Sequence, residues 1–269
     1  MTPVACVIFT CNKNFDVLST CMPTMQKMID AYDCFVATDS FSKNQLDTLN
    51  SRKSEPFEVV QAGENASWIE VAKVITKVLR GRGYEGFICV LDDFYFTDID
   101  ETKLISLTGA AVKDEVDYFR LVDEKPRLSR LFANSAASHP KIKSLVQIPA
   151  DNPYKHSLSL SYWRVSYFES LMNMYLSIWD FETVNPIKGA VLYYVPDTCC
   201  KYQHIVEKGR MAPFAKKMFT RANMLDNERA TESRFEYAVK WFRSNLVFYI
   251  FGYHFMNRRL RKSRHSSST

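Results

Sequence analysis

Two adjacent carboxylates, Asp92 and Asp93, follow directly on an apolar run at residues 87–91. The run has the length and composition of a strand that is buried on both faces. Paired carboxylates at the end of such a strand can hold a divalent cation, because Mg²⁺ and Mn²⁺ prefer oxygen ligands. A cation there would neutralise the charge of a departing diphosphate. The dipeptide is also compatible with a cap or turn that ends the strand, so both interpretations stay open at this point.

Polar side chains also follow two earlier apolar runs, at residues 4–10 and 34–37. Thr10 closes the first run, and Asp39 comes two residues after the second. In open parallel sheets, ligands bind beyond the carboxyl ends of the strands. This agreement in position predicts a nucleotide site in the N-terminal half of the chain. Asp39 has an alternative role as an Asx-turn or helix N-cap residue.

The elements that must position these residues alternate between strands and helices. The clearest helix begins near Ser67 and Glu70, which are spaced as a capping box, with Asn65 as a second candidate cap. This alternation predicts a parallel sheet with helices on both faces. We expect strands at residues 4–10, 34–37, 57–61, 87–91, 116–122 and 190–195. We expect helices at residues 18–32, 41–49, 67–80, 162–174 and 227–240.

Several stretches resemble segments of GT-A glycosyltransferases, in particular enzymes that assemble surface polysaccharides of the capsule or lipopolysaccharide type. One is a helix followed by an apolar strand that ends in Asp-Asp-Phe, which resembles the donor site. Another resembles the acceptor side. In the family the acidic motif is usually Asp-X-Asp, whereas here Leu91 stands at its first position. The matching stretches are residues 65–79, 87–96, 154–164, 177–182 and, more weakly, 202–210.

The resemblance implies an α/β, Rossmann-like GT-A fold, with a mostly parallel central sheet flanked by helices and a C-terminal helical tail. Residues 1–225 would form the GT-A domain, with a donor half at about 1–125 and an acceptor half at about 126–225. The implied activity is metal-dependent transfer of a sugar, with Mn²⁺ or Mg²⁺, from a nucleotide-diphosphate sugar to a hydroxyl of a glycan or lipid-linked acceptor. We expect inversion, because two carboxylates near residue 181 offer a base for the acceptor proton.

The resemblance also assigns roles to individual residues. Asp93 and His204 would bind the metal, and Glu182, with Asp180 second, would be the catalytic base. The expected donor-binding residues are Thr10, Asp39, Asn65, Asp92, Lys208 and Arg210. Structural roles stay open for several of them: the two acids could begin a helix, and His204 could be an ordinary structural histidine.

The formal charge of +5 is concentrated at the C-terminus. The five basic residues between 256 and 269 are accompanied by no acidic residue, and without them the chain has 30 basic and 30 acidic residues. A formally neutral body argues against nucleic acid as a partner, because nucleic-acid-binding domains carry a basic face. The seven cysteines lie mostly in apolar runs and form no CxxC motif. With no evident signal peptide, they predict reduced thiols in a cytoplasmic protein.

The tail, residues 226–269, has the composition of a membrane-associating helix. Residues 241–256 are rich in aromatic and aliphatic side chains but are interrupted by polar ones. A membrane-spanning helix needs about 20 mainly apolar residues, so spanning is not expected. An aromatic segment followed by a basic cluster suits an interfacial helix on an anionic membrane, which predicts peripheral attachment at the cytosolic face. A core-packed or dimer-forming helix is the alternative.

Two other classes of function remain compatible with the sequence. One is a metal-dependent phosphotransferase or nuclease built from Asp92, Asp93 and Glu182. The neutral body argues against the nuclease form. The other is a non-catalytic, membrane-associated interaction protein. The carboxylates at successive strand ends argue against it, but less strongly.

Overall fold

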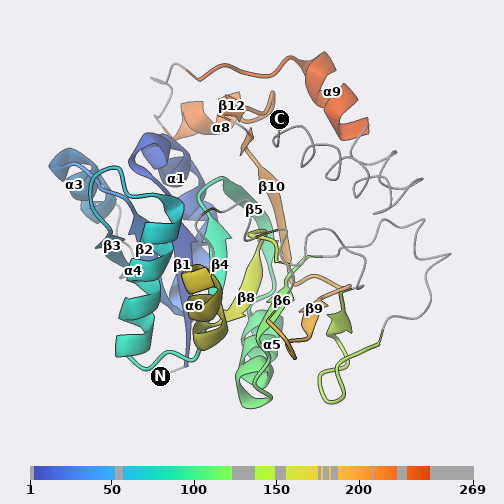
Figure 1. Ribbon diagram of the computed structural model, residues 1–269. Helices are drawn as coiled ribbons and strands as arrows, with labels where there is room; N and C mark the ends of the chain where they lie inside the picture. The colour runs from blue at the N-terminus through green and yellow to red at the C-terminus, as the bar shows by residue number, and fades with distance from the viewer. Residues whose placement is uncertain are drawn as a thin grey trace, which may run out of the picture.

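The computed structural model describes residues 3–51, 57–122, 137–148, 156–174, 177, 182, 187–207, 209–222 and 229–242. The main sheet is built from β1 (Val4–Phe9), β2 (Asp33–Thr38), β3 (Phe57–Gln61), β4 (Gly86–Leu91), β6 (Tyr118–Arg120), β7 (Val146–Gln147), β8 (Ser161–Arg164) and β9 (Leu192–Tyr194). Among the described residues, these eight strands have the order β3-β2-β1-β4-β8-β6-β9-β7 (Figure 1). The first four strands in this order run parallel to one another, and β8 joins β4 in the antiparallel direction.

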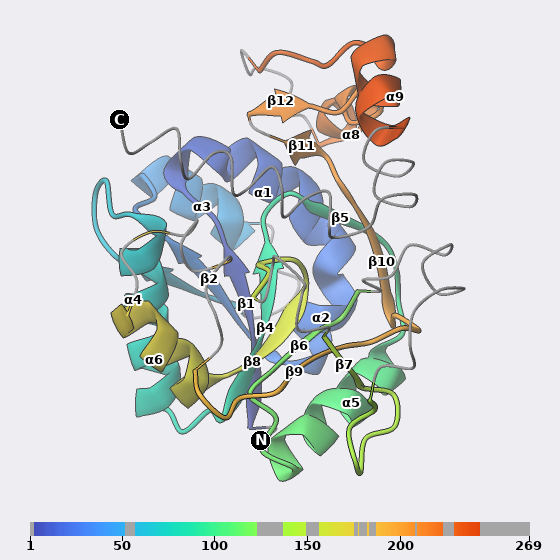
Figure 2. The ribbon, with the colours of Figure 1, turned by 45° about the vertical axis from the view of Figure 1, so that its right-hand side comes forward.

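Helices cover both faces of the sheet (Figure 2). They are α1 (Phe15–Cys21), α2 (Gln26–Ala31), α3 (Lys43–Ser51), α4 (Trp68–Gly81), α5 (Glu101–Lys113) and α6 (Val165–Met174). Side chains of β1 alternate between the two layers, because successive residues of a strand point to opposite faces. Cys6 and Ile8 pack with α1, α2 and α5, whereas Val7 and Phe9 pack with α4 and α6. The sheet is therefore buried on both sides, as the continuous apolar runs predicted.

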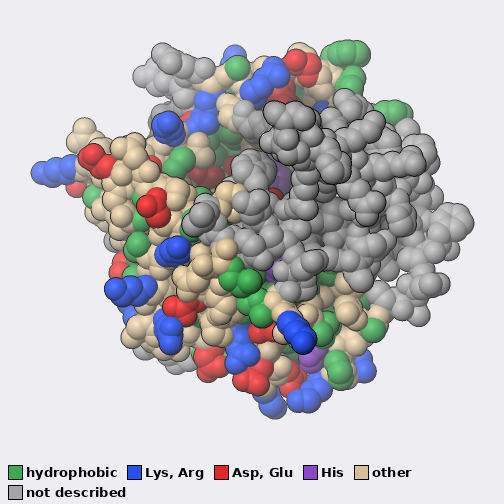
Figure 3. Space-filling view, in the orientation of Figure 1, with side chains coloured by type: hydrophobic (Ala, Val, Ile, Leu, Met, Phe, Trp, Pro, Cys, Tyr) green, Lys and Arg blue, Asp and Glu red, His purple; other side chains and the backbone are tan. Residues whose placement is uncertain are grey.

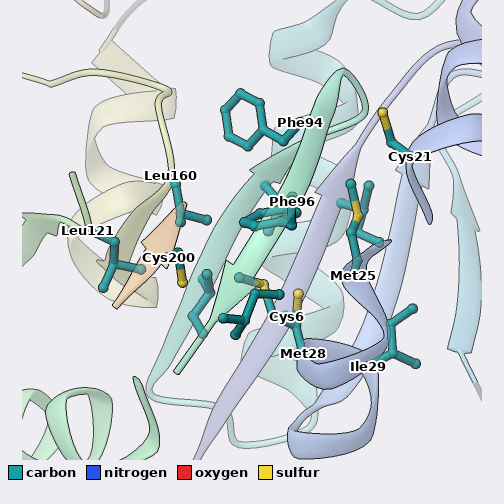
Figure 4. Packing of buried hydrophobic residues seen from close by; sticks show 14 of the residues in the cluster. Cys6, Cys21, Met25, Met28, Ile29, Phe94, Phe96, Leu121, Leu160 and Cys200 are labelled. Atoms are coloured by element: carbon teal, nitrogen blue, oxygen red, sulfur yellow. The ribbon is translucent and has the colours of Figure 1, made fainter. Parts of the chain in front are cut away.

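Two short antiparallel sheets lie beside the main one. β5 (Phe94–Ile99) pairs with β10 (Cys200–His204), and β11 (Val206–Glu207) pairs with β12 (Arg210–Met211). Phe96 of β5 packs in one cluster with Cys6, Met25 and Met28 (Figure 4). The last described elements are α8 (Lys216–Arg221) and α9 (Arg234–Phe242).

Three expected helices differ from the structure. The helix expected at 18–32 is broken at Pro23 into α1, a 3-10 turn (Met22–Met25) and α2, because proline cannot donate a backbone hydrogen bond. The helix expected at 162–174 begins only at Val165, since β8 pairs with both β4 and β6. The helix expected at 227–240 begins only at Arg234. Before it, Thr231 bridges to Met211 in the extended conformation.

Most of the C-terminal tail lies outside the described residues, so its expected helix at 241–256 and the boundary at residue 225 remain predictions. Within the described part of the chain, none of the helices is long and apolar enough to cross a membrane. Six cysteines are buried, and Cys11 is half-buried.

Candidate active site

A pocket of about 380 Å³ lies at the carboxyl ends of β1, β2 and β4. Its volume is in the range of sites that bind small molecules. The polar residues in its lining come from the segments that follow three strands and from one segment near the C-terminus: they are Thr10, Asn14, Asp39, Asp92, Asp93 and Arg229. Thr10, Asp39, Asp92 and Asp93 are residues that the sequence singled out. The structure therefore brings these four together at one edge of the sheet.

Asp92 is buried and joins the end of β4 to the end of β1. Its carboxylate accepts a hydrogen bond of 2.7 Å from the hydroxyl of Thr10, and its backbone N–H donates to Phe9 at 3.1 Å. Burial, and to a lesser extent the charge of Asp93, raise the pKa of Asp92, while the hydrogen bond from Thr10 opposes the rise, and the net result is a pKa of about 7. Asn14 and Arg229 lower it. One carboxylate oxygen of Asp92 is thus already engaged by Thr10.

Asp93 faces His204, which is 111 residues away in the sequence, across the small β5–β10 sheet. Asp93 Oδ2 lies 2.9 Å from His204 Nδ1. Antiparallel pairing places His204 opposite Phe94, and the N–H of Ile205 donates to the carbonyl of Asp93 at 3.1 Å. Burial lowers the pKa of His204, but the hydrogen bond to Asp93 and the charge of that carboxylate outweigh it, so the pKa is raised above its usual value. The two expected metal ligands therefore lie in contact.

The donor set of Asp93 and His204 fits a divalent cation. Asp93 Oδ1 is buried and has no hydrogen-bond partner among the described residues. Carboxylate oxygen and imidazole nitrogen both suit Mn²⁺, and Mg²⁺ usually takes one or two carboxylates together with substrate phosphates. The described residues contain no group of three or more His, Cys, Asp or Glu side chains placed to hold a metal. A cation here would therefore complete its coordination with oxygens of the bound substrate.

Asp39 and Asn65 have different relations to the pocket. Asp39 lines it and accepts a hydrogen bond of 2.7 Å from the backbone N–H of Asn12, so it fixes the loop that follows β1. Asn65 is exposed in a turn, with φ of 59°, and does not line the pocket. The cap of α4 is Ser67, whose reciprocal hydrogen bonds with Glu70 form the predicted capping box. Asn65 therefore has no pocket contact in this structure, and the neighbouring Ala66 takes that place.

The apolar wall of the pocket was not identified from the sequence. Trp68, at the first position of α4, lines the pocket, and its ring centroid lies 5.2 Å from that of Phe9. The capping box could have identified Trp68 from the sequence, because it places this residue directly after the cap, at the carboxyl edge of the sheet. An aromatic wall next to polar strand ends suits a ligand that has both a planar ring and charged groups.

Arg229 is the second residue that the sequence analysis missed. It reaches the pocket because residues 230 and 232 hydrogen-bond along Met211 of β12. Its guanidinium donates to both carboxylate oxygens of Asp16, at 2.9 and 3.0 Å, and also to Asn14 Oδ1 at 2.9 Å and to the carbonyl of Lys13. Arg229 thereby ties a C-terminal segment to the loop after β1. It also supplies a positive charge at the edge of the pocket.

The remaining expected site residues lie beside the pocket or outside the described residues. Glu182 Oε1 accepts a hydrogen bond of 3.1 Å from the backbone N–H of Leu158, which lines the pocket. Burial raises the pKa of Glu182, and the hydrogen bond from Leu158 and the charge of Arg120 oppose the rise. Arg210 forms an ion pair with Glu236 at 3.1 Å and does not line the pocket. Asp180 and Lys208 lie outside the described residues.

No protein-family model matches the chain, and no curated protein matches it in sequence. Among solved structures, GalNAc-T7 with UDP, GalNAc and Mn²⁺ aligns with 76% of this chain and 44% of its own at a TM-score of 0.51 and 14% identity. Two further structures align more loosely. TarS 1-349 of S. aureus in complex with UDP-GlcNAc aligns with 77% of this chain and 59% of its own, at a TM-score of 0.46 and 11% identity. The mannosyltransferase PcManGT from Pyrobaculum calidifontis in complex with GDP-Man and Mn²⁺ aligns with 77% of this chain and 58% of its own, at a TM-score of 0.44 and 10% identity.

The chain spans less than half the length of the GalNAc-T7 chain that it matches. The likeness to GalNAc-T7 identifies the fold: this chain has the GT-A fold, which confirms the fold class expected from the sequence.

Proposed function

We propose that this protein is a metal-dependent glycosyltransferase that takes a sugar from a nucleotide-diphosphate donor and passes it to a hydroxyl of a glycan or lipid-linked acceptor. The observation that carries the proposal is the contact of Asp93 with His204 at the edge of the pocket, with Asp93 Oδ1 buried and unpartnered among the described residues. The alignment with GalNAc-T7, whose structure contains UDP and Mn²⁺, supports the same kind of ligand.

In this proposal, Asp93 and His204 hold Mn²⁺ or Mg²⁺ at the pocket edge. The bound cation supplies positive charge that stabilises the departing diphosphate. The hydrogen bond from Thr10 to Asp92 fixes the end of β4 against β1. The neighbouring Asp93 is therefore held in position before the donor binds. A pre-organised carboxylate of this kind loses little free energy to reordering when the donor binds.

The donor would lie along the pocket from Trp68 towards Asp93. Trp68 and Phe9 offer a planar apolar surface that suits the ring of a nucleobase or sugar. Arg229 also lines the pocket and carries a charge opposite to that of a diphosphate. The pocket thus combines an apolar surface, an acidic metal-binding edge and one cation, which is the chemistry that a nucleotide sugar requires.

Glu182 is the proposed base that removes the proton of the acceptor hydroxyl. Because its pKa is raised, the Glu182 carboxyl stays partly protonated at pH values above its ordinary pKa of 4.5. Because only the carboxylate can accept a proton, activity is expected to rise as the pH rises through this raised pKa. Replacing Glu182 with glutamine should lower kcat by about 10²- to 10⁴-fold and remove the acid limb of the pH profile.

Two variants accompany the Glu182→Gln measurement. Glu169→Gln on α6, which alters an exposed ion pair with Arg80, should leave both kcat and the pH profile unchanged. Asp180→Asn tests the second candidate base. If Asp180→Asn removes the acid limb while Glu182→Gln keeps it, the assignment of the base to Glu182 is wrong.

The proposed function is tested by a thermal-shift screen of UDP-, GDP-, CMP- and dTDP-linked sugars, each with and without Mn²⁺. A ligand that binds only the folded state raises the melting temperature, by the equivalent of about 2.7 kcal/mol at a hundred times its Kd. We expect a metal-dependent rise with one nucleotide family. A rise with free nucleotides together with phosphate release, and no sugar transfer, would favour a phosphotransferase. No rise with any donor at millimolar concentration would refute the proposal.

A further inference from the structure

We infer that the outward face of α9 docks on an anionic lipid bilayer. Six large apolar side chains are exposed among the described residues, and three of them, Phe235, Val239 and Phe242, lie on this nine-residue helix. Their exposed fractions are 79%, 41% and 55%. Because residues of a helix follow one another at about 100°, positions 235, 239 and 242 fall on one side. Apolar side chains gather over α9 at the upper right of Figure 3.

Two charged residues of α9, in contrast, form ion pairs with other segments of the domain. Glu236 forms an ion pair of 3.1 Å with Arg210, and Lys240 forms ion pairs with Glu207 and, at 3.1 Å, with Glu232. The ring of Tyr237 lies 5.7 Å from that of Phe214, in an edge-on contact. A surface helix normally buries its apolar stripe and exposes its polar one. On α9, in contrast, Phe235, Val239 and Phe242 are exposed, so this apolar stripe is available to something outside the described structure.

The position of α9 is fixed at its N-terminus. The hydroxyl of Ser233 accepts a hydrogen bond from the N–H of Glu236 at 3.1 Å, and the Glu236 carboxylate accepts one from the N–H of Ser233 at 2.9 Å. These reciprocal bonds form a capping box. The capping box and the ion pairs together hold α9 with Phe235, Val239 and Phe242 facing outward.

Charge and size favour a membrane surface over a protein partner. Glu236 is the last acidic residue of the chain, and six Lys or Arg residues follow α9 between 243 and 269. Lys216, Lys217 and Arg221 of the neighbouring α8 are also exposed. Basic residues next to a bilayer are each attracted to anionic lipids. Three side chains are far fewer than the 20 to 30 residues that each side of a stable protein interface contributes, roughly, whereas an interfacial helix needs only a shallow apolar face.

The test uses the full chain in flotation assays with vesicles of phosphatidylcholine alone and of phosphatidylcholine with phosphatidylglycerol. The double variant Phe235→Ser/Phe242→Ser should bind the anionic vesicles about tenfold more weakly, or weaker still, because two partly buried rings are lost from the lipid contact. A matched control, Ile105→Ser/Met174→Ser, removes two exposed apolar side chains from α5 and α6 and should bind within about twofold of the unchanged protein. Added salt should weaken binding through screening.

The outcomes separate the possible occupants of this face. Equal vesicle binding by the protein and the Phe235→Ser/Phe242→Ser variant would overturn the inference, as would the absence of binding to anionic vesicles. If light scattering shows that the unchanged protein is a dimer and the double variant is a monomer, the face is assigned to a second copy of the chain instead. If the double variant unfolds, Phe235→Ser alone, at the most exposed position, gives the same comparison. None of these measurements depends on sugar transfer, so they are independent of the proposed function.

Discussion

Replacing Asp93 with asparagine is expected to abolish the metal-dependent rise in melting temperature with donor and to lower turnover by about 10²-fold or more. The amide keeps the shape of the side chain and can still contact His204, but it removes the charge that attracts a divalent cation. The loss of one preorganised electrostatic group at a reacting centre commonly costs this much. Thermal shift with Mn²⁺ and donor, followed by a turnover assay, measures both effects.

The fold itself should tolerate this change. Asp93 lies next to the buried Asp92, whose pKa it raises, so removing its charge relieves a repulsion. The matched control is Asp98→Asn, on β5, which alters an exposed ion pair with Lys201 at 3.2 Å and should change neither binding nor turnover. Wild-type turnover in Asp93→Asn would rule out the metal site. A melting temperature well below that of wild type without ligand would mean that the loss is structural and would contradict the assigned role.

Replacing Arg229 with alanine is expected to destabilise the protein by roughly 2–3 kcal/mol and to weaken donor binding. Arg229 and Asp16 are only 16% and 18% exposed, and their bidentate contact links the C-terminal segment to the first turn of α1. Without the guanidinium, Asp16 and Asn14 lose charge-assisted hydrogen bonds in an environment that is largely shielded from water, and this loss lowers the free energy of unfolding. In a domain of this size each kcal/mol shifts Tm by about 2–4 °C, so thermal denaturation resolves the effect.

A double-mutant cycle separates this ion pair from the general effects of truncation. Arg229→Gln, Asp16→Asn and the double variant give the coupling free energy, which should exceed about 1 kcal/mol. Arg82 and Glu58 provide the control, because they have a similar bidentate geometry, at 2.7 Å for both bonds, but are each 47% exposed. Their coupling should stay below about 1 kcal/mol. Equal coupling in the two cycles would mean that burial at the pocket adds nothing to the Arg229–Asp16 pair.

The sequence carried much of the information about the donor half, because the decisive patterns there are local. Continuous apolar runs identified β1, β2 and β4, and the Ser67–Glu70 spacing identified the start of α4. Once three parallel strands are established, the polar residues that follow them must meet at one edge of the sheet. Thr10, Asp39 and the Asp92-Asp93 pair lie at that edge for this reason. Whether these residues have the roles that we propose for them is decided by the variants described above.

Where local patterns compete, the sequence was misleading. Residues 162–164 have helical spacing, but they form the end of β8 because this strand completes the sheet between β4 and β6. Residues 229–233 continue a helical pattern, yet they lie extended along β12, where Ala230 and Glu232 both hydrogen-bond to Met211. In both cases, hydrogen bonds to distant strands outweighed a weak local preference. A helical preference of this kind is worth only a few tenths of a kcal/mol per residue, roughly.

Composition and local order in the sequence determined the fold class, the edge of the sheet where the pocket lies and the excess of positive charge at the C-terminus. The family resemblance had already paired His204 with Asp93, but only the tertiary structure decided the contacts by which distant groups join that edge. His204 meets Asp93 across 111 residues through the register of β5 with β10, and Arg229 meets Asp16 across 213 residues. The outward orientation of α9 was likewise decided by its ion pairs with other segments. The periodicity of a sequence indicates which side chains share a face of one element. The pairing between elements depends instead on packing and hydrogen bonds summed over the whole chain. A shift of one residue in strand register would turn every side chain of that strand to the other face.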